Sequence, residues 1–287
     1  MTQNAMVRRV YRWLGWKIAI AALTLVCCLG WLPPAAASKI SDFPRAEALT
    51  EESLADLESL YQAALAATQN GNFVLAEDIW TQAIALFPEN PASWSNRGNA
   101  RMSQNKLQAA LEDYNQSVTL APDLPDPYLN RGVVFERLED WDAAIADYNQ
   151  ALSFNPQDPV AYNNRGNAEA GARQWQAAIA DYQHAVDLAP AYAAARANYT
   201  LALWQNGDLP AAIRQMRNLI RKYPQFADMR AALTAALWQT GQRGEAESNW
   251  FAAVGLDRRY KDLTWVQQIR RWPPVAVEAL DNFLAIR

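Results

Sequence analysis

A 34-residue period runs through most of this chain and restricts its fold more than any other feature does. When the sequence is written in rows of 34, three columns keep their character from row to row. One column holds only alanine: Ala76, Ala110, Ala144, Ala178, Ala212 and Ala246. A second is bulky: Trp80, Tyr114, Tyr148, Tyr182, Met216 and Trp250. A third holds Pro88, Pro122, Pro156, Pro190 and Pro224, with Arg258 in the sixth row. The period predicts six gapless repeats, at 57–90, 91–124, 125–158, 159–192, 193–226 and 227–260.

Each repeat has the pattern of two helices. In the second repeat, Trp94 and Arg101 are seven residues apart on one helical face, and Ala110 and Tyr114 lie on a second helix. The eighth position of every repeat is small: Ala64, Gly98, Gly132, Gly166, Thr200 and Thr234. A short side chain there predicts a close approach between the two helices of the repeat.

A residue that favours left-handed backbone marks the end of the first helix in four repeats. These residues are Gly71, Asn105, Gly207 and Gly241, the types expected at a helix C-terminal cap. Glu139 and Arg173 occupy the same position in the third and fourth repeats and depart from the rule. The proline near the end of most repeats cannot extend a helix and so sets the turn into the next repeat.

These columns resemble the tetratricopeptide-repeat family. The resemblance implies an all-α fold, a right-handed α-solenoid of six helix-turn-helix repeats whose first helices line a concave groove. Since no repeat buries its apolar stripe alone, neighbours must stack. Residues 261–287 carry two short helical stretches, 263–271 and 275–284, around Trp272-Pro273-Pro274. We expect them to form a C-terminal capping helical hairpin.

The N-terminus is typical of an export signal. Residues 1–17 are basic, 18–32 are nearly all apolar, and small residues follow, so cleavage is predicted after Ala37. The alternative is an uncleaved membrane anchor, although Pro33-Pro34 shortens the apolar stretch to about 15 residues where a span needs about 20. Residues 38–56 are predicted to be a linker and the start of the first helix, with Thr50 as its N-cap.

Charge argues against a nucleic-acid partner. The chain has 26 basic and 30 acidic residues, and loss of the four basic residues of the signal would leave a net charge of −8. The charge is uneven, with a net of −12 over 38–160 and +4 over 161–287. Such asymmetry orients a partner electrostatically, or it is an accidental property of a solvated surface.

The composition argues against most enzyme chemistry. The chain has one histidine, His184, and its two cysteines, Cys27 and Cys28, lie inside the predicted signal. No glycine-rich phosphate loop and no metal-ligand spacing is present in the sequence, and no cofactor is predicted. The sequence therefore favours a non-catalytic protein.

Asparagines supply the main candidate binding site. The family geometry implies that positions 2, 5, 6, 9, 12 and 13 of each repeat face the groove. Those positions hold Asn96, Asn99, Asn130, Asn163, Asn164, Asn167 and Asn198. A carboxamide both donates and accepts, so this ladder suits the backbone of an extended peptide. The alternative interpretation is that the asparagines tie neighbouring helices together.

Three further sets of residues have two interpretations each. Trp204 and Trp238, both at position 12, are candidate anchors for a partner or core residues. Arg97, Arg131 and Arg165 would meet acidic partner groups or, as we favour, pair internally with Asp or Glu. A basic C-terminal cluster would touch anionic lipid or an acidic protein, or is a solvated cap: Arg258, Arg259, Lys261, Arg270 and Arg271.

The predicted function is a protein-protein interaction scaffold that binds an extended client segment in its groove. The runs at 216–226, 246–250 and 270–274 are similar to exported tetratricopeptide proteins of cyanobacteria and of the chloroplast thylakoid lumen. That resemblance implies a thylakoid lumen or periplasm location and a role in assembling or stabilising a membrane complex. The alternative is a membrane-tethered structural protein that acts through its outer face and basic cap.

Overall fold

The computed structural model describes residues 51–286. The predicted export signal, the linker up to residue 50 and the Thr50 cap lie outside the described residues. The described chain is all helical and has no strand. Its α-helices are α2 (Glu51–Gln69), α3 (Phe73–Leu86), α4 (Pro91–Ser103), α5 (Leu107–Leu120), α6 (Pro125–Arg137), α7 (Trp141–Phe154), α8 (Pro159–Gly171), α9 (Trp175–Leu188), α10 (Ala193–Gln205), α11 (Leu209–Lys222), α12 (Ala227–Gln239), α13 (Arg243–Leu256), α14 (Leu263–Gln268) and α15 (Pro274–Leu284), with a 3-10 helix η3 (Arg258–Lys261).

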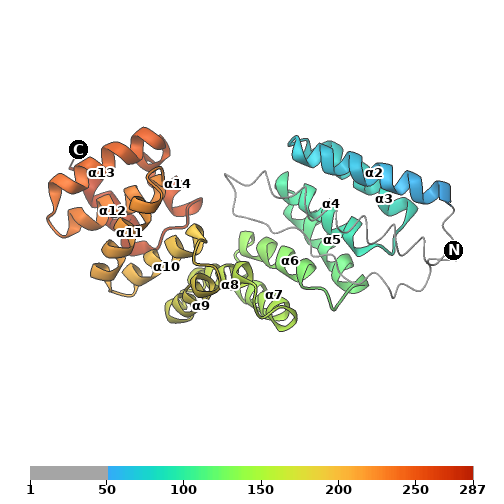
Figure 1. Ribbon diagram of the computed structural model, residues 1–287, viewed down its shortest axis with the longest axis horizontal. Coiled ribbons are helices and arrows are strands. Elements are labelled where there is room, and N and C mark those ends of the chain that lie inside the picture. The colour runs from blue at the N-terminus through green and yellow to red at the C-terminus, as the bar shows by residue number, and fades with distance from the viewer. Residues whose placement is uncertain (1–50, 287) are drawn as a thin grey trace. The chain divides into compact units, whose positions relative to one another are not determined.

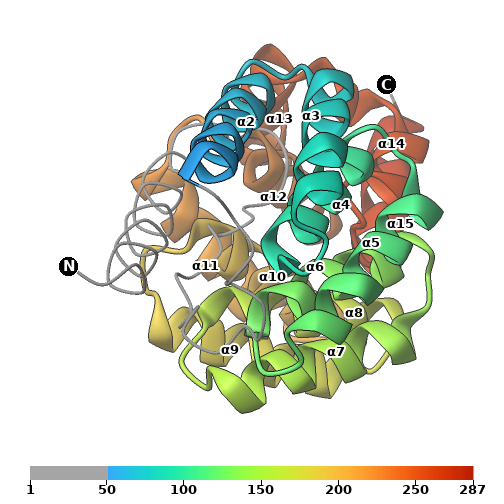
Figure 2. The ribbon, with the colours of Figure 1, turned by 90° about the vertical axis from the view of Figure 1, so that its right-hand side faces the viewer.

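The chain divides into two compact units, which we describe separately. Unit 1 ends at Pro156 and unit 2 begins at Gln157. In unit 1, α2 packs on α3, α4 on α5 and α6 on α7, and each pair also contacts the next (Figure 1). Unit 2 repeats this arrangement with α8 to α13 and adds η3, α14 and α15 (Figure 2). The predicted all-α repeat fold is therefore confirmed.

The helix starts are set by local chemistry. Asn90 accepts a hydrogen bond from the Ala92 backbone N–H at 2.9 Å, and Pro91 supplies the first residue of α4. Asp158 caps α8 in the same way, again followed by proline. Proline suits this position because its missing N–H has no partner within the helix anyway.

The small eighth position brings the two helices of a repeat into contact, as the sequence predicts. A Cβ added to Gly132 would lie 2.6 Å from the buried ring of Tyr148. The corresponding distances are 2.8 Å from Gly98 to Tyr114 and 2.8 Å from Gly166 to Tyr182. Only glycine permits this approach while the ring keeps its place, so the small and aromatic columns form one contact.

The cap position is left-handed in every repeat. Gly71, Asn105, Gly207 and Gly241 have φ values of 71°, 61°, 92° and 78°. Glu139 and Arg173, which depart from the sequence rule, adopt the same conformation with φ of 60° and 61°. The third and fourth repeats therefore differ from the others in residue type but not in backbone geometry. The turn between paired helices requires the left-handed conformation, even though it costs a non-glycine residue about 1 kcal/mol.

The C-terminal segment completes the core of unit 2. α14 and α15 correspond to the two helical stretches expected in the cap. α15 packs against α10 and α12, the first helices of the fifth and sixth predicted repeats. Its buried side chains join the core of those repeats, so the cap covers a face of the array as well as its end.

Candidate functional site

The predicted asparagines of unit 1 lie on α4 and α6. Tyr114 donates a hydrogen bond from Oη to Asn99 Oδ1 at 2.7 Å. Asn130 donates from Nδ2 to Ser95 Oγ at 3.3 Å and so joins the two helices. Asn96 is half-buried, and among the described residues its side chain has no hydrogen-bond partner. We call these three asparagines the amide surface of unit 1.

The asparagines of unit 2 bond mostly to one another. Asn198 on α10 donates to Asn163 Oδ1 and to Asn167 Oδ1, both at 3.0 Å, and so joins α10 to α8. Asn163 is only 4% exposed and donates to Asn164 Oδ1 at 3.3 Å. Tyr182 Oη also donates to Asn167 at 3.0 Å. Asn163, Asn167 and Asn198 thus tie α8 to α10, whereas the bond from Asn163 to Asn164 lies within α8.

The arginine column pairs internally, as expected. Arg97, Arg131 and Arg165 each form two hydrogen bonds to an aspartate 16 residues later, at 2.6 to 3.0 Å. These aspartates, which are 1% to 6% exposed, are Asp113, Asp147 and Asp181. Each guanidinium also lies 4.9 to 5.6 Å from the aromatic ring three residues before it: Trp94, Tyr128 and Tyr162. We call each such arrangement a clasp.

The central clasp reaches a third helix. Arg131 on α6 also donates to Asn115 Oδ1 on α5 at 2.9 Å, so it joins α6, α7 and the preceding repeat. Burial raises the pKa of Asp147, and the hydrogen bonds from Arg131 oppose that rise. The carboxylate therefore depends on its arginine to stay charged.

The tryptophan prediction requires a correction. Trp204 is 2% exposed and belongs to the core of unit 2, so it offers no accessible anchor. Trp238 is half-buried and packs edge-on against Phe283 of α15, with ring centroids 5.2 Å apart. The reason is that α15 covers this face of α10 and α12, which the sequence alone does not reveal.

A buried carboxylate anchors the C-terminal segment. Asp228 of α12 is 5% exposed, and its Oδ1 accepts from Tyr260 Oη at 2.8 Å and from Trp272 Nε1 at 2.9 Å. Arg270 Nε also donates to this oxygen, at 3.0 Å, and the charge of Asp228 raises the pKa of Arg270. One member of the predicted basic cluster is therefore a structural partner. Arg259 is a second, paired with Asp257 at 2.8 Å.

One buried acid lacks a complete set of partners. Among the described residues, Glu169 Oε2 is buried and accepts no hydrogen bond. Burial raises the pKa of Glu169 to about 7, the nearby Asp181 carboxylate adds to the rise, and Arg165 opposes it. The acid thus lies beside the clasp of the fourth repeat, within unit 2.

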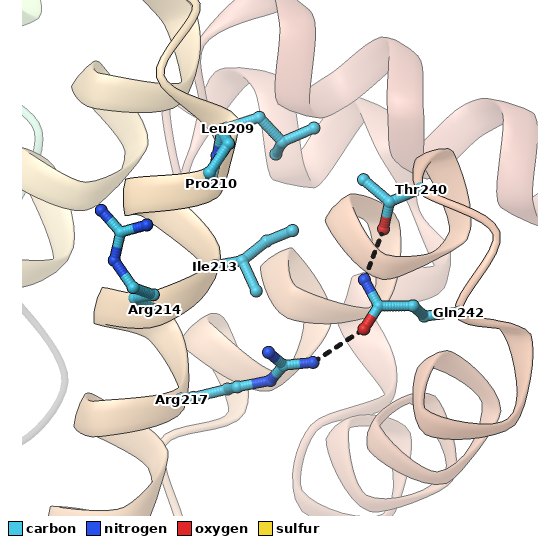
Figure 3. A pocket seen from close by; sticks show the side chains of 7 residues that line it. All are labelled: Leu209, Pro210, Ile213, Arg214, Arg217, Thr240 and Gln242. Atoms are coloured by element: carbon cyan, nitrogen blue, oxygen red, sulfur yellow. Dashed lines mark hydrogen bonds between the residues drawn. The ribbon is translucent and has the colours of Figure 1, made fainter.

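A shallow depression lies on the second-helix side of unit 2. It has a volume of about 290 Å³ and is lined by Leu209, Pro210, Ile213, Arg214, Arg217, Thr240 and Gln242. Figure 3 shows Arg217 directed at Gln242, to which it donates at 3.0 Å, while Arg214 points away from them. Since Arg217 is also paired with Glu245, the depression presents little free polar chemistry.

Sequence reasoning missed two features of unit 2. One is Asp228 as the anchor of the cap, because its donors lie up to 44 residues away. The other is the run of small residues at the expected groove positions of α12, namely Ala231, Ala232 and Ala235, all fully buried. These alanines are visible in the sequence and were the one available signal that something packs closely there.

No cluster of three or more potential metal-ligating side chains occurs in residues 51–286. None of the helices in that range is long and apolar enough to cross a membrane.

The chain belongs to the tetratricopeptide repeat family. One family model, described as a tetratricopeptide repeat, matches residues 99–163. A second matches residues 61–125, 163–215 and 200–259. Members of this family are in general non-catalytic scaffolds. A search of curated protein sequences returned no match.

Solved structures with the same fold are distant in sequence. YrrB, a TPR protein with an unusual peptide-binding site, is 21% identical with a TM-score of 0.51, over 67% of this chain and 97% of that one. MamA from Desulfovibrio magneticus is 18% identical with a TM-score of 0.54, over 57% and 93%. The Cut9–Hcn1 complex of the APC/C is 15% identical with a TM-score of 0.63, over 82% and 47%. At these identities the likeness concerns the fold alone.

Proposed function

We propose that this protein is an interaction scaffold and that the amide surface of unit 1 holds an extended segment of a client protein. The observation that carries this proposal is Asn96, a half-buried carboxamide that has no internal partner among the described residues. Such a group pairs with a peptide N–H and C=O without regard to the client side chains. The peptide-binding site named for YrrB is consistent with this use of the fold.

The charge of unit 1 favours a basic client. Residues 51–156, the described part of unit 1, contain 5 basic and 16 acidic residues. Arg97, Arg101, Lys106 and Arg131 are all engaged in internal ion pairs. Exposed acids such as Asp78, Glu112 and Asp142 therefore set the field around the unit. A positively charged segment is attracted by this field, and salt weakens the attraction.

The test is quantitative affinity capture from native membranes with three forms of the protein. Asn96→Ala is expected to reduce recovery of the client at least fivefold, because it removes an amide that is free to bind. Its melting temperature should stay within about 2 °C of the wild type, since no internal bond is lost. The matched control is Asn282→Ala, an exposed asparagine of unit 2 that should leave recovery unchanged.

A second comparison separates binding from structure. Asn198→Ala removes two internal hydrogen bonds and should destabilise unit 2 by about 1–2 kcal/mol without selective loss of a client of unit 1. If the partner lists of wild type and Asn96→Ala coincide, the amide surface is structural and the proposal is wrong.

We further propose that the protein is exported to the thylakoid lumen or periplasm, where the scaffold assists assembly or stabilisation of a membrane complex. The support is the basic, apolar and small-residue order of residues 1–37. N-terminal sequencing of the protein isolated from its source is expected to begin at Ser38. An intact N-terminus would instead favour the membrane-tethered alternative.

A further inference from the structure

One repeat carries a charge pattern that the others lack. Arg214, Arg217 and Arg221 occupy positions 22, 25 and 29 of the fifth repeat, and none of these positions is basic in the other five repeats. The spacing of three and four residues places the three side chains on one side of α11. Because the other repeats fold without them, the repeat architecture does not require these arginines. We call them the arginine stripe.

Two of the three charges lack an acidic partner. Arg217 is paired with Glu245. Arg214 is exposed, and among the described residues it makes no hydrogen bond and no ion pair. Arg221 donates to Asn218 Oδ1 on its own helix, which is a neutral group. Since α11 contains no acidic residue, the stripe presents net positive charge to solvent.

The helix dipole accounts for only part of this charge. A cation in the last turn of a helix is stabilised by the unpaired carbonyl groups there, and Arg221 and Lys222 occupy that turn. Arg214 lies in the first half of α11, where the dipole gives a cation no such benefit. Arg214 therefore has neither an internal partner nor a role at the helix end.

An apolar notch adjoins the stripe. It is the apolar part of the depression of about 290 Å³ in unit 2, and it is formed by Leu209, Pro210 and Ile213 of α11, with Arg214 and Arg217 beside them (Figure 3). The notch has room for one apolar side chain, whose burial there is favourable. Arg214 points away from Arg217 in this view, so its guanidinium is free to meet a ligand outside the notch.

We propose that the arginine stripe and the apolar notch together bind an acidic segment of a partner protein. One apolar side chain of the segment fills the notch, and neighbouring carboxylates pair with Arg214 and Arg221. These two arginines are seven residues apart, which is about 10 Å along a helix. An extended chain covers that distance in about three residues, so the segment carries its apolar and acidic residues within one short stretch. The stripe lies on a second helix, so the proposal does not rest on the amide surface of unit 1.

Charge complementarity favours a narrow segment over a broad anionic surface. Two carboxylates border the stripe: Glu245, whose side chain is 42% exposed beside Arg217, and Asp208, which is exposed just before α11 begins. A lipid bilayer or a nucleic acid brings its negative charge onto these acids as well, and that repulsion costs free energy. A single extended segment lies along the arginines and leaves both acids in water.

The test measures binding of two fluorescein-labelled peptides to the full chain, one in which a leucine precedes four glutamates and one in which it follows them. At least one peptide is expected to bind the wild type, and added salt should weaken its binding. Arg214→Ala, Arg221→Ala should weaken that binding at least tenfold, because it removes two charge-assisted hydrogen bonds. The melting temperature of this variant should stay within about 2 °C of the wild type, since neither arginine has an acidic partner among the described residues.

Three controls locate the binding. Arg258→Ala, Lys261→Ala removes two exposed basic residues of unit 2 outside the stripe and should leave the affinity unchanged. A peptide with serine in place of leucine should bind at least fivefold more weakly, because it leaves the notch empty. Asn96→Ala should bind the acidic peptide as the wild type does, so that failure of the stripe and failure of the amide surface are distinguishable.

Three outcomes would overturn the proposal. The first is failure of both peptides to bind, or equal binding to the wild type and to Arg214→Ala, Arg221→Ala. The second is binding to phosphatidylserine vesicles that depends on the stripe while neither peptide binds, which would identify a membrane as the partner. The third is a dimer in sedimentation that the same double variant dissociates, since the occupant would then be the acidic unit 1 of a second copy.

Discussion

Arg131→Ala is expected to lower the free energy of unfolding by about 3 kcal/mol, because it leaves the Asp147 carboxylate buried without its partner. The substitution removes two hydrogen bonds to Asp147 and one to Asn115. Urea denaturation followed by circular dichroism measures the change. Arg137→Ala is the matched control on the same helix, since Arg137 is exposed, and it should shift stability by about 0.5 kcal/mol or less.

A double variant separates two contributions to the free energy of unfolding. One is the cost of leaving the Asp147 carboxylate unpaired, and the other is the stabilisation that the Arg131–Asp147 ion pair itself provides. Arg131→Met, Asp147→Leu removes both charges and fills similar volume, so it should be more stable than Arg131→Ala. If the double variant is less stable than the single one, the unpaired Asp147 carboxylate is not what destabilises Arg131→Ala, and our account of its energetics is wrong.

Glu169→Gln is expected to stabilise the protein at pH 8 by about 2 kcal/mol and to remove a pH dependence. The pKa of Glu169 is raised to about 7 in the folded protein, above its usual value near 4.5. The folded state therefore binds an extra proton between these values. It follows that the stability of the wild type falls as pH rises from about 4.5 to about 7 and stays low above that range.

The measurement is the difference in unfolding free energy between wild type and Glu169→Gln at pH 5 and pH 8. The amide keeps the shape of the side chain and donates a hydrogen bond toward Asp181. Glu112→Gln changes an exposed glutamate of unit 1 and should show no such difference. A wild type that is equally destabilised relative to Glu169→Gln at both pH values would contradict the prediction.

Features that repeat along the chain were predictable because they depend on local spacing. The alanine, glycine and aromatic columns predicted paired helices in close contact, and the distance from Gly132 to Tyr148 confirms it. The internal pairing of the arginine column was also predicted. Its aspartate partners lie 16 residues away within the same repeat, a separation that the helix pair fixes.

Features that depend on a single residue were less predictable. Glu139 and Arg173 adopt the left-handed cap conformation although neither is a glycine or an asparagine, the residue types that predict it. The asparagines look alike in the sequence, yet Asn198 has two internal partners while Asn96 has none among the described residues. Their neighbours decide this difference, and those neighbours come from the adjacent repeat.

The sequence by itself determined that this protein is an all-α repeat array, because helical periodicity, small-residue contacts and turn residues act over a few positions and recur every 34. Only the tertiary structure decided which face of the last repeats is covered. α10 and α12 carry the buried Trp204 and the buried alanines, and α15 packs against both helices after an anchor that joins Asp228 to Trp272, 44 residues later. A contact made once, between segments far apart in the chain, does not recur every 34 residues, so the sequence period cannot predict it.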